Sequence, residues 1–251
     1  MKIDFTLVIP TRLRMNLVEL QLLSIKKLSN KPENIEIIYI FDDDDTATIE
    51  FMKGIDKKWP MKIITIQRDR AGVKNLNHSY YNYGASFGSG DVYWALGNDC
   101  VITSKDWDKK AKQKIKEFTK DNKDNLAYIV VNDGFTGQAG NCCFPMLTKE
   151  SVRIFGGLFP IEFVSWGADV ALYEIYENLE KKRIVDCYEE VALENHSYHA
   201  QNYPKDQVSE EVEQLNIDHP TPTPGHPSLV AYTRKLNNYL KLFYPKTKLG
   251  A

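Results

Sequence analysis

The stretch Asn82-Tyr-Gly-Ala-Ser-Phe-Gly-Ser-Gly-Asp-Val-Tyr-Trp-Ala-Leu-Gly-Asn-Asp99 decides the fold. A glycine-rich turn leads into a short apolar run at residues 92–96, and this run ends at a lone acid, Asp99. Such an acid lies where α/β sheets bind ligands, just outside the carboxyl edge. A second apolar run, at residues 35–41, ends in four aspartates at residues 42–45. Two strands that deliver carboxylates to one edge predict a divalent cation and a phosphate-bearing ligand.

The first half of the chain alternates apolar runs with helical spacing. Strands are expected at residues 5–9, 35–41, 61–66 and 92–96, and helices at residues 16–28, 46–57 and 76–87. Pro10 is expected to stop the first strand. This rhythm predicts an α/β fold with a mostly parallel, doubly wound sheet.

The second half is less regular. A helix is expected at 107–120, a strand at 127–131, a glycine-rich loop at 133–141, a strand at 142–147, a helix at 170–181 and a strand at 184–191. The Pro-rich segment at 218–227 is expected to be a connector, and Ser228 to cap a helix that runs to about Phe243.

Composition narrows the class of protein. The chain has 251 residues, 43% of them hydrophobic, which is enough for a real core, and its net charge of −2 disfavours general binding to polyanions. Four cysteines form no spaced framework, and no apolar signal region precedes the first strand. No run approaches the ~20 apolar residues of a membrane span. We therefore expect a cytoplasmic protein without a transmembrane segment.

Five motifs occur in an informative order. They are Pro10-Thr11-Arg12, Asp42-Asp43-Asp44-Asp45-Thr46, Asn82-Tyr-Gly84-Ala-Ser-Phe-Gly88-Ser-Gly90, Gly97-Asn98-Asp99 and Gly156-Gly157-Leu-Phe-Pro-Ile-Glu-Phe163-Val-Ser-Trp166-Gly167-Ala168-Asp169. With these motifs the chain resembles the GT-A fold glycosyltransferases, most closely the large inverting family 2, over roughly residues 4–200. Two positions depart from the family pattern. Gly97 stands where the family has the first acid of Asp-x-Asp, and Ala168 where it has a Glu.

The resemblance implies a GT-A (Rossmann-like) mostly parallel mixed sheet flanked by helices, with a C-terminal helical extension. Residues 1–202 would form the catalytic domain, in which 1–100 bind the nucleotide sugar and 127–200 the acceptor. Residues 203–251 would form a Pro-rich linker and a helix. The activity implied is an inverting, metal-dependent transfer from a nucleotide sugar, with a UDP-sugar most expected, to a hydroxyl of a glycan acceptor.

The resemblance also implies a metal site. Asp99 would bind Mn²⁺ or Mg²⁺, since hard cations prefer oxygen ligands and manganese also tolerates imidazole. The second ligand would be a late histidine after a strand-like segment, either His196, which we favour, or His199. The alternative is that both histidines lie in a surface loop.

An inverting transfer needs a general base that takes the proton of the acceptor hydroxyl. Asp169 holds the family position for this base, next to Trp166, which would form a wall for sugar stacking. The alternative is that Asp169 is only an acid at a helix N-terminus.

The remaining candidates would contact the donor. Pro10, Thr11 and Arg12 would line the base pocket, Asp43 would accept from the base or ribose, and Asn98 would contact the ribose. Lys74 and Asn77 would contact the rest of the donor, and Arg68 and Arg70 are alternatives for contact with phosphate.

Three other functions remain open at this point. A phage-type DNA-base glycosyltransferase would need a basic groove. The dense basic cluster at residues 109–116 is expected to be a solvated helix face instead, so a nucleic-acid partner is disfavoured. A nucleotidyltransferase usually has a glycine-rich loop after its first strand, and residues 10–14 have no glycine. A non-catalytic nucleotide- or glycan-binding module is the third alternative.

Overall fold

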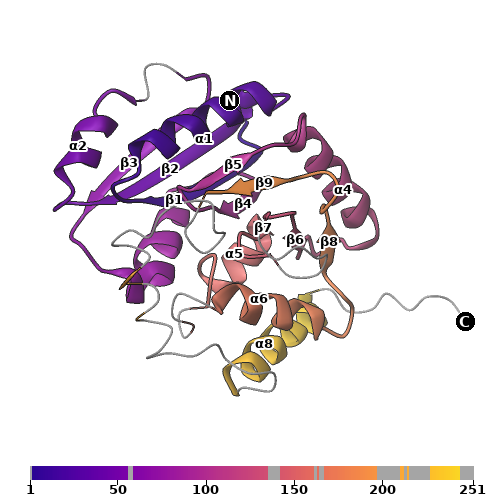
Figure 1. Ribbon diagram of the computed structural model, residues 1–251. Coiled ribbons are helices and arrows are strands. Elements are labelled where there is room, and N and C mark those ends of the chain that lie inside the picture. The colour runs from indigo at the N-terminus through magenta and orange to yellow at the C-terminus, as the bar shows by residue number, and fades with distance from the viewer. Residues whose placement is uncertain are drawn as a thin grey trace, which may run out of the picture.

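The structure is a computed structural model that describes residues 2–55, 59–134, 142–160, 163, 167–196, 210–211, 214 and 227–243. A seven-stranded sheet with the order β3-β2-β1-β4-β7-β6-β8 forms its centre, and a two-stranded sheet pairs β5 with β9 (Figure 1). The strands are β1 (Phe5–Thr11), β2 (Ile35–Asp42), β3 (Lys62–Arg68), β4 (Val92–Ala95), β5 (Cys100–Ile102), β6 (Tyr128–Val130), β7 (Met146–Thr148), β8 (Ile184–Asp186) and β9 (Leu193–Asn195).

The large sheet is mostly parallel. Strand β7 runs antiparallel to β4 and β6, whereas the other neighbours in this sheet pair in parallel. Every residue of β2 is buried, as expected for a parallel strand that is covered on both faces. The predicted α/β class with a mostly parallel mixed sheet is confirmed.

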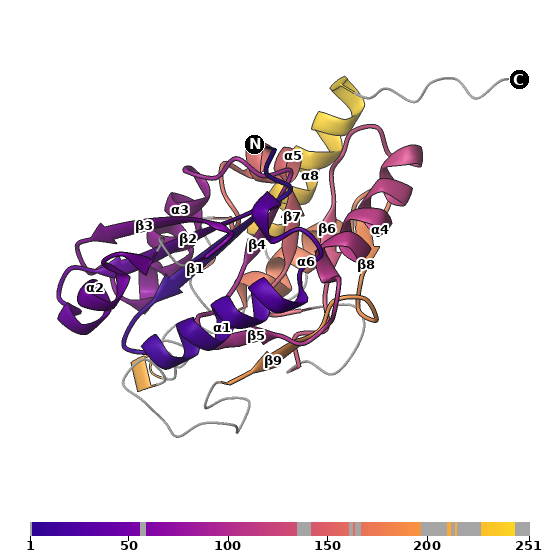
Figure 2. The same ribbon diagram turned by 90° about the horizontal axis from the view of Figure 1, so that it is seen from above.

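Helices cover both faces of the sheet. They are α1 (Met15–Leu28), α2 (Thr46–Met52), α3 (Tyr83–Ala85), α4 (Trp107–Asp121), α5 (Lys149–Phe155), α6 (Ala168–Glu177), α8 (Pro227–Phe243), the 3₁₀ turns η1 (Pro32–Asn34) and η3 (Val73–Asn75), and the π-helix η4 (Leu76–Asn82). Helix α1 lies on one face of β1 and β2, and α3 lies on the other (Figure 2).

The order of the strands reverses at β1. The chain proceeds from β1 to β2 to β3 in one direction and then places β4 on the other side of β1. Such a reversal separates the loops that follow the two central strands, and ligands bind there in open α/β sheets. The turn after β1 and the turn after β4 therefore flank the expected binding crevice.

The glycine-rich motif before β4 is explained by close packing against the sheet, with Gly84 on Val8 and Ile40 and with Gly90 at the amino end of β1. A Cβ on Gly84 would lie 2.3 Å from Ile40 Cδ1, and one on Gly90 would lie 2.8 Å from the backbone nitrogen of Thr6. The loop is tied down by the buried Glu36, which accepts hydrogen bonds from the hydroxyls of Thr6 (2.6 Å) and Ser89 (3.0 Å). These glycines are needed for close approach of backbone to sheet.

The prediction that Pro10 ends the first strand is wrong, because β1 continues to Thr11. The C=O of Val8 accepts from the N–H of Leu96, so the backbone groups of Val8, and of Pro10 two residues later, face β4. The pairing of β1 with β4 ends at Val8, so no ladder bond is lost where proline lacks its N–H.

Other predicted elements differ in extent. The helix expected at 46–57 ends at Met52, the one expected at 76–87 is a π-helix followed by a single α-turn, and the strands expected at 142–147 and 184–191 shrink to β7 and β8. The short elements β5, β9 and α5 were not predicted. The loop expected at 133–141 and the connector at 218–227 lie largely outside the described residues.

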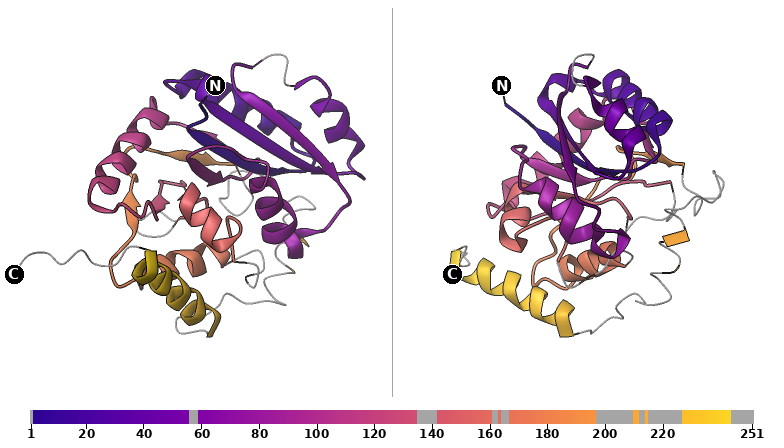
Figure 3. Two further views of the ribbon diagram at one scale, coloured as in Figure 1. Left: turned by 180° about the vertical axis from the view of Figure 1, so that it is seen from behind. Right: turned by 90° about the vertical axis from the view of Figure 1, so that its left-hand side faces the viewer.

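The C-terminal helix α8 packs beside α6, at the end of the molecule away from α1 and α2 (Figure 3). Leu236 is fully buried, and the ring of Tyr232 lies 5.7 Å from that of Phe155 and 6.4 Å from that of Phe163. The division at residue 202 remains a prediction. Within the described part of the chain, we find no helix with the length and apolar character required to cross a membrane.

Candidate active site

The turn that follows β4 is held rigidly from two sides. The side-chain amide of the buried Gln21, on α1, donates to the C=O groups of Gly97 and Cys100, each at 2.8 Å. Strand β5 pairs with β9 in the register Cys100↔Asn195, and the N–H of His196 donates to the C=O of Asp99 at 2.8 Å. The structure therefore brings Asp99 and His196, two residues selected from the sequence, to adjacent strand ends.

Asp99 forms an ion pair with a residue that sequence reasoning did not select. Arg14 Nη1 lies 2.6 Å from Asp99 Oδ2 and 3.4 Å from Asn98 Oδ1. Both side chains are nearly buried, with exposed fractions of 14% for Arg14 and 12% for Asp99. The pair joins the turn after β1 to the turn after β4, across the crevice where the strand order reverses.

Gly97 has a steric reason to lack a side chain. A Cβ at this position would lie 2.4 Å from Asp99 Oδ1 and 3.2 Å from the ring of Phe144. The position at which the resembled family has its first acid is therefore filled here by the carboxylate of Asp99 itself. Oδ1 also accepts from the Cys100 thiol at 3.6 Å, which leaves Oδ2 facing Arg14.

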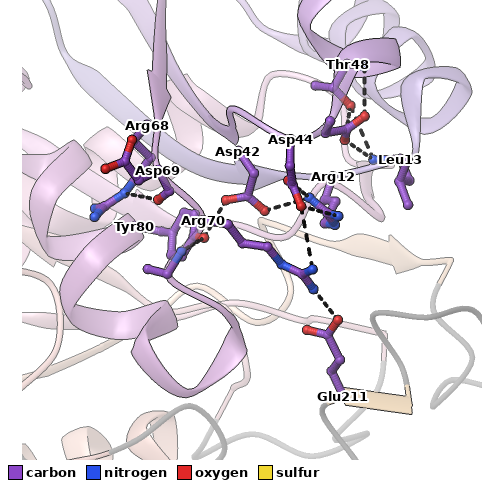
Figure 4. Close-up of polar contacts among 12 residues, drawn as sticks. Arg12, Leu13, Asp42, Asp44, Thr48, Arg68, Asp69, Arg70, Tyr80 and Glu211 are labelled. Atoms are coloured by element: carbon purple, nitrogen blue, oxygen red, sulfur yellow. Dashed lines mark hydrogen bonds and ion pairs between the residues drawn. The ribbon is translucent and has the colours of Figure 1, made fainter.

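A second charged network follows β2. Arg12 donates to Asp42 Oδ2 (3.0 Å) and to both oxygens of Asp44 (2.5 and 3.2 Å), and Arg70 pairs with Asp44 and Glu211 (Figure 4). The hydrogen bond and charge of Arg12 hold the pKa of Asp44 below its ordinary value. Tyr80, from the π-helix, donates to Asp42 on the other side. These contacts arrange cationic side chains along the edge where β2 and β3 end.

Asp45 shapes the turn that carries Arg14. It caps α2 by accepting from the N–H of Thr48 (3.0 Å), and its second oxygen accepts from the N–H of Leu13 (2.9 Å) and the Thr48 hydroxyl (2.6 Å). Burial raises the pKa of Asp45, but these hydrogen bonds outweigh it and hold the pKa below its ordinary value. Leu13 adopts a positive φ of 56°, a rare conformation for a leucine.

Asp169 lies in the first turn of α6, partly buried. Burial raises the pKa of its carboxyl group to about 6, helped by the nearby charge of Asp133. Hydrogen bonds from the backbone of α6 and from the Cys143 thiol act in the opposite direction but are weaker. A carboxylate with a pKa near 6 is ionised at neutral pH and still basic enough to accept a proton, which suits a general base.

Tyr81 connects the two acidic positions. Its hydroxyl is buried and donates to the C=O of Leu96, at the end of β4. Burial raises the pKa of the Tyr81 hydroxyl well above its ordinary value, and the carboxylate charges of Asp99 and Asp169 raise it further. Both carboxylates therefore act on the Tyr81 hydroxyl.

A backbone hydrogen bond places Asp99 and His196 at adjacent strand ends, while His196 Nε2 lies 3.5 Å from Glu194 Oε1. An aspartate and a histidine offer an oxygen and a nitrogen donor, and manganese accepts both. Among the described residues no group of three or more His, Cys, Asp or Glu side chains forms a complete metal site. Such a site would take its remaining ligands from phosphate oxygens and water.

The other predicted residues fall in different places. Pro10 and Thr11 end β1 beside the crevice, Asp43 is exposed at the end of β2, and Lys74 is exposed on η3. The amide of the buried Asn77 donates to the C=O of Phe163 at 2.6 Å, which anchors the segment before α6. Trp166 and His199 lie outside the described residues.

Comparisons with known proteins agree with this geometry at the level of the fold. No family model matches the sequence, and no curated protein matches it. Solved structures do match. Mannosyltransferase PcManGT from Pyrobaculum calidifontis, in complex with GDP-Man and Mn²⁺, is similar with a TM-score of 0.57 and 13% identity, over 94% of this chain and 70% of that one.

Residues 1–349 of TarS from S. aureus are similar too. The complex with UDP gives a TM-score of 0.58 over 96% of this chain and 73% of that one, and the complex with UDP-GlcNAc gives 0.54 over 98% and 77%, each at 13% identity. The chain has the GT-A glycosyltransferase fold. Identity this low shows the fold alone, so the activity rests on the residues of this chain.

Within this GT-A fold, sequence reasoning missed three residues that organise the site. Gln21 holds the turn of Asp99, Arg14 pairs with Asp99, and Asp45 fixes the turn that carries Arg14. The two arginines in Pro10-Thr-Arg-Leu-Arg14 were the available signal for Arg14. Nothing local marks Gln21, because its partners Gly97 and Cys100 lie 76 and 79 positions away in the sequence.

Proposed function

We propose that this protein is a metal-dependent inverting glycosyltransferase that moves a sugar from a nucleotide sugar, with a UDP-sugar most expected, to a hydroxyl of a glycan. The observation that supports the proposal is the backbone hydrogen bond that joins Asp99 to His196 beyond β4, together with the raised pKa of Asp169. The matches to structures that contain UDP, UDP-GlcNAc, GDP-Man and Mn²⁺ support a nucleotide-sugar donor.

The proposed transfer moves one sugar and one proton. Asp169 accepts the proton of the acceptor hydroxyl while the hydroxyl oxygen attacks the anomeric carbon. The bond from that carbon to the diphosphate oxygen breaks with inversion, and the nucleoside diphosphate leaves with the bonding electrons. A bound divalent cation supplies charge neutralisation for the leaving diphosphate, and Asp99 and His196 would hold it.

The donor half follows from the first half of the chain. Thr11, Arg12 and Asp43 stand where the turns after β1 and β2 meet, and we assign them to the nucleoside. Arg70 reaches the same edge from the end of β3. A cytoplasmic location is also proposed, because none of the four cysteines forms a disulfide.

The test combines binding and turnover. Nucleoside diphosphate release is measured from UDP-glucose, UDP-galactose, UDP-GlcNAc and GDP-mannose, with and without Mn²⁺, after a thermal-shift screen of the same donors. We expect at least one donor to raise the melting temperature in a Mn²⁺-dependent way and to be hydrolysed slowly. Asp99→Asn should remove the Mn²⁺-dependent part of binding. Intact binding with no turnover of any donor would instead identify a non-catalytic module.

A further inference from the structure

Arg14 lies in the turn between β1 and α1, at a position that helix formation does not explain. Arg14 occupies the N-cap position of α1 without any side-chain capping bond, whereas Ser, Thr, Asp and Asn are the residues that favour this position. The residue before it, Leu13, has a positive φ and an exposed side chain. Both features cost stability, and such costs concentrate at functional sites.

The charges around Asp99 indicate what Arg14 does. With Gly97 in place of a second acid, the turn after β4 offers one carboxylate, and Arg14 neutralises it. A divalent cation ligated by Asp99 Oδ2 would lie about 2 Å from that oxygen. The Arg14 nitrogen already lies 2.6 Å from the same oxygen, so cation and guanidinium would repel each other there. The two positive groups therefore compete for one oxygen.

We propose that Arg14 is a donor-binding residue, held against Asp99 in the absence of ligand and transferred to the diphosphate when a divalent cation replaces it on Asp99. This inference rests on the proposed function, because it requires a nucleoside diphosphate ligand. A guanidinium presents donors in a planar fork that matches phosphate oxygens. Arg14 belongs to the turn that flanks the crevice, so its guanidinium reaches the diphosphate by side-chain rotation.

The charge on the leaving group favours the same assignment. A diphosphate linked to a sugar carries about two negative charges, and a free nucleoside diphosphate carries about three at neutral pH. A divalent cation and Arg14 together supply three positive charges, of which the Asp99 carboxylate offsets one. The third negative charge appears as the bond to the sugar breaks, so Arg14 stabilises the transition state more than the ground state.

A double-mutant cycle on Arg14 and Asp99 separates this role from a merely structural one. Binding of UDP and GDP is measured by titration calorimetry for wild type, Arg14→Gln, Asp99→Asn and the double variant, without metal and with Mn²⁺. UMP serves as the comparison ligand because it lacks the second phosphate. Arg153→Gln is the matched control, because Arg153 pairs with Glu150 within α5 and is exposed.

The substitutions should change the affinity for the diphosphate in opposite directions without metal and with Mn²⁺. Without metal, Asp99→Asn should bind the diphosphate about tenfold more tightly than wild type, because Arg14 is released, and the double variant should lose this gain. With Mn²⁺, Arg14→Gln should bind the diphosphate about tenfold more weakly and UMP within twofold of wild type. Arg153→Gln should match wild type throughout.

Two results would overturn the inference alone. One is a metal-free diphosphate affinity in Asp99→Asn that equals that of wild type. The other is a wild-type diphosphate affinity in Arg14→Gln with Mn²⁺. If Arg14→Gln fails to fold, the comparison of Asp99→Asn with wild type decides the question by itself. A wild-type protein that binds neither UDP nor GDP with Mn²⁺ overturns the proposed function and, with it, the role of Arg14.

Discussion

Replacement of Asp169 by asparagine should make the protein inactive and more stable at the same time. The carboxyl group has a pKa of about 6 in the folded protein, mainly because it is buried, against an ordinary value of 3.8. Between these two pH values the folded state binds more protons than the unfolded state, so stability falls as pH rises from about 4 to about 6 and is constant above. Each pKa unit is equivalent to about 1.4 kcal/mol.

The ionised carboxylate therefore lowers the free energy of unfolding by up to about 3 kcal/mol at pH 8. An asparagine side chain at this position cannot ionise and keeps one oxygen as an acceptor for the backbone of α6. The free energy of unfolding of Asp169→Asn should therefore exceed that of wild type by up to about 3 kcal/mol at pH 8 and should differ little from it at pH 4. Turnover should fall by about 10²- to 10⁴-fold with donor binding unchanged, as loss of a general base requires.

Urea unfolding of both proteins from pH 4 to pH 8 measures the stability, and release of nucleoside diphosphate measures turnover. Asp45→Asn is a suitable control because the folded protein lowers the pKa of Asp45. The Asp45 carboxylate therefore stabilises the fold above pH 4, and its replacement should lower the free energy of unfolding there. A variant of Asp169 that is less stable than wild type at pH 8, or that retains turnover, would refute the assignment. Wild-type turnover should also rise with pH through about 6.

Three further substitutions test how the parts of the fold are joined. Gly157→Ala should cost about 1–3 kcal/mol in urea unfolding, because its Cβ would lie 2.3 Å from Asn82 Cγ, whose amide holds the backbone of Phe159. Leu236→Ala should lower the stability measured in the main unfolding transition by about 2–5 kcal/mol, since the side chain is fully buried in α8, and a separate early transition would show α8 to be an independent appendage. Glu36→Gln should cost about 1–3 kcal/mol at pH 7, and its difference from wild type should shrink below pH 4, because the folded protein lowers the pKa of this buried carboxylate.

Much of the donor half could be predicted from local sequence. Strands β1, β2 and β4 are largely apolar runs bounded by turn residues, and β3 has apolar residues at its centre. Such patterns are set by residues that are close in the sequence. The glycine motif that begins at Asn82 was also readable, although its glycines serve packing against the sheet. Strands β5 and β9 were missed, because Cys100–Ile102 directly follows the turn of Asp99 and Leu193–Asn195 contains a single apolar residue.

The acidic residues show the same division. Asp42, Asp44 and Asp45 look equivalent in the sequence. In the structure, Asp42 accepts hydrogen bonds from Tyr80 and Arg12, and Asp44 pairs with Arg12 and Arg70. Asp45 instead caps helix α2. No pattern in the sequence separates a carboxylate that caps a helix from one that faces a crevice.

The sequence by itself determined that β1 to β4 form and that acids follow the second and fourth of them, because burial of apolar runs and breaking by turn residues act between near neighbours. Only the tertiary structure decided which charges meet. Arg14 and Asp99 are 85 positions apart, and they pair because β1 and β4 are adjacent in the sheet. Ion pairing depends on distance through space, and the order of the strands sets that distance.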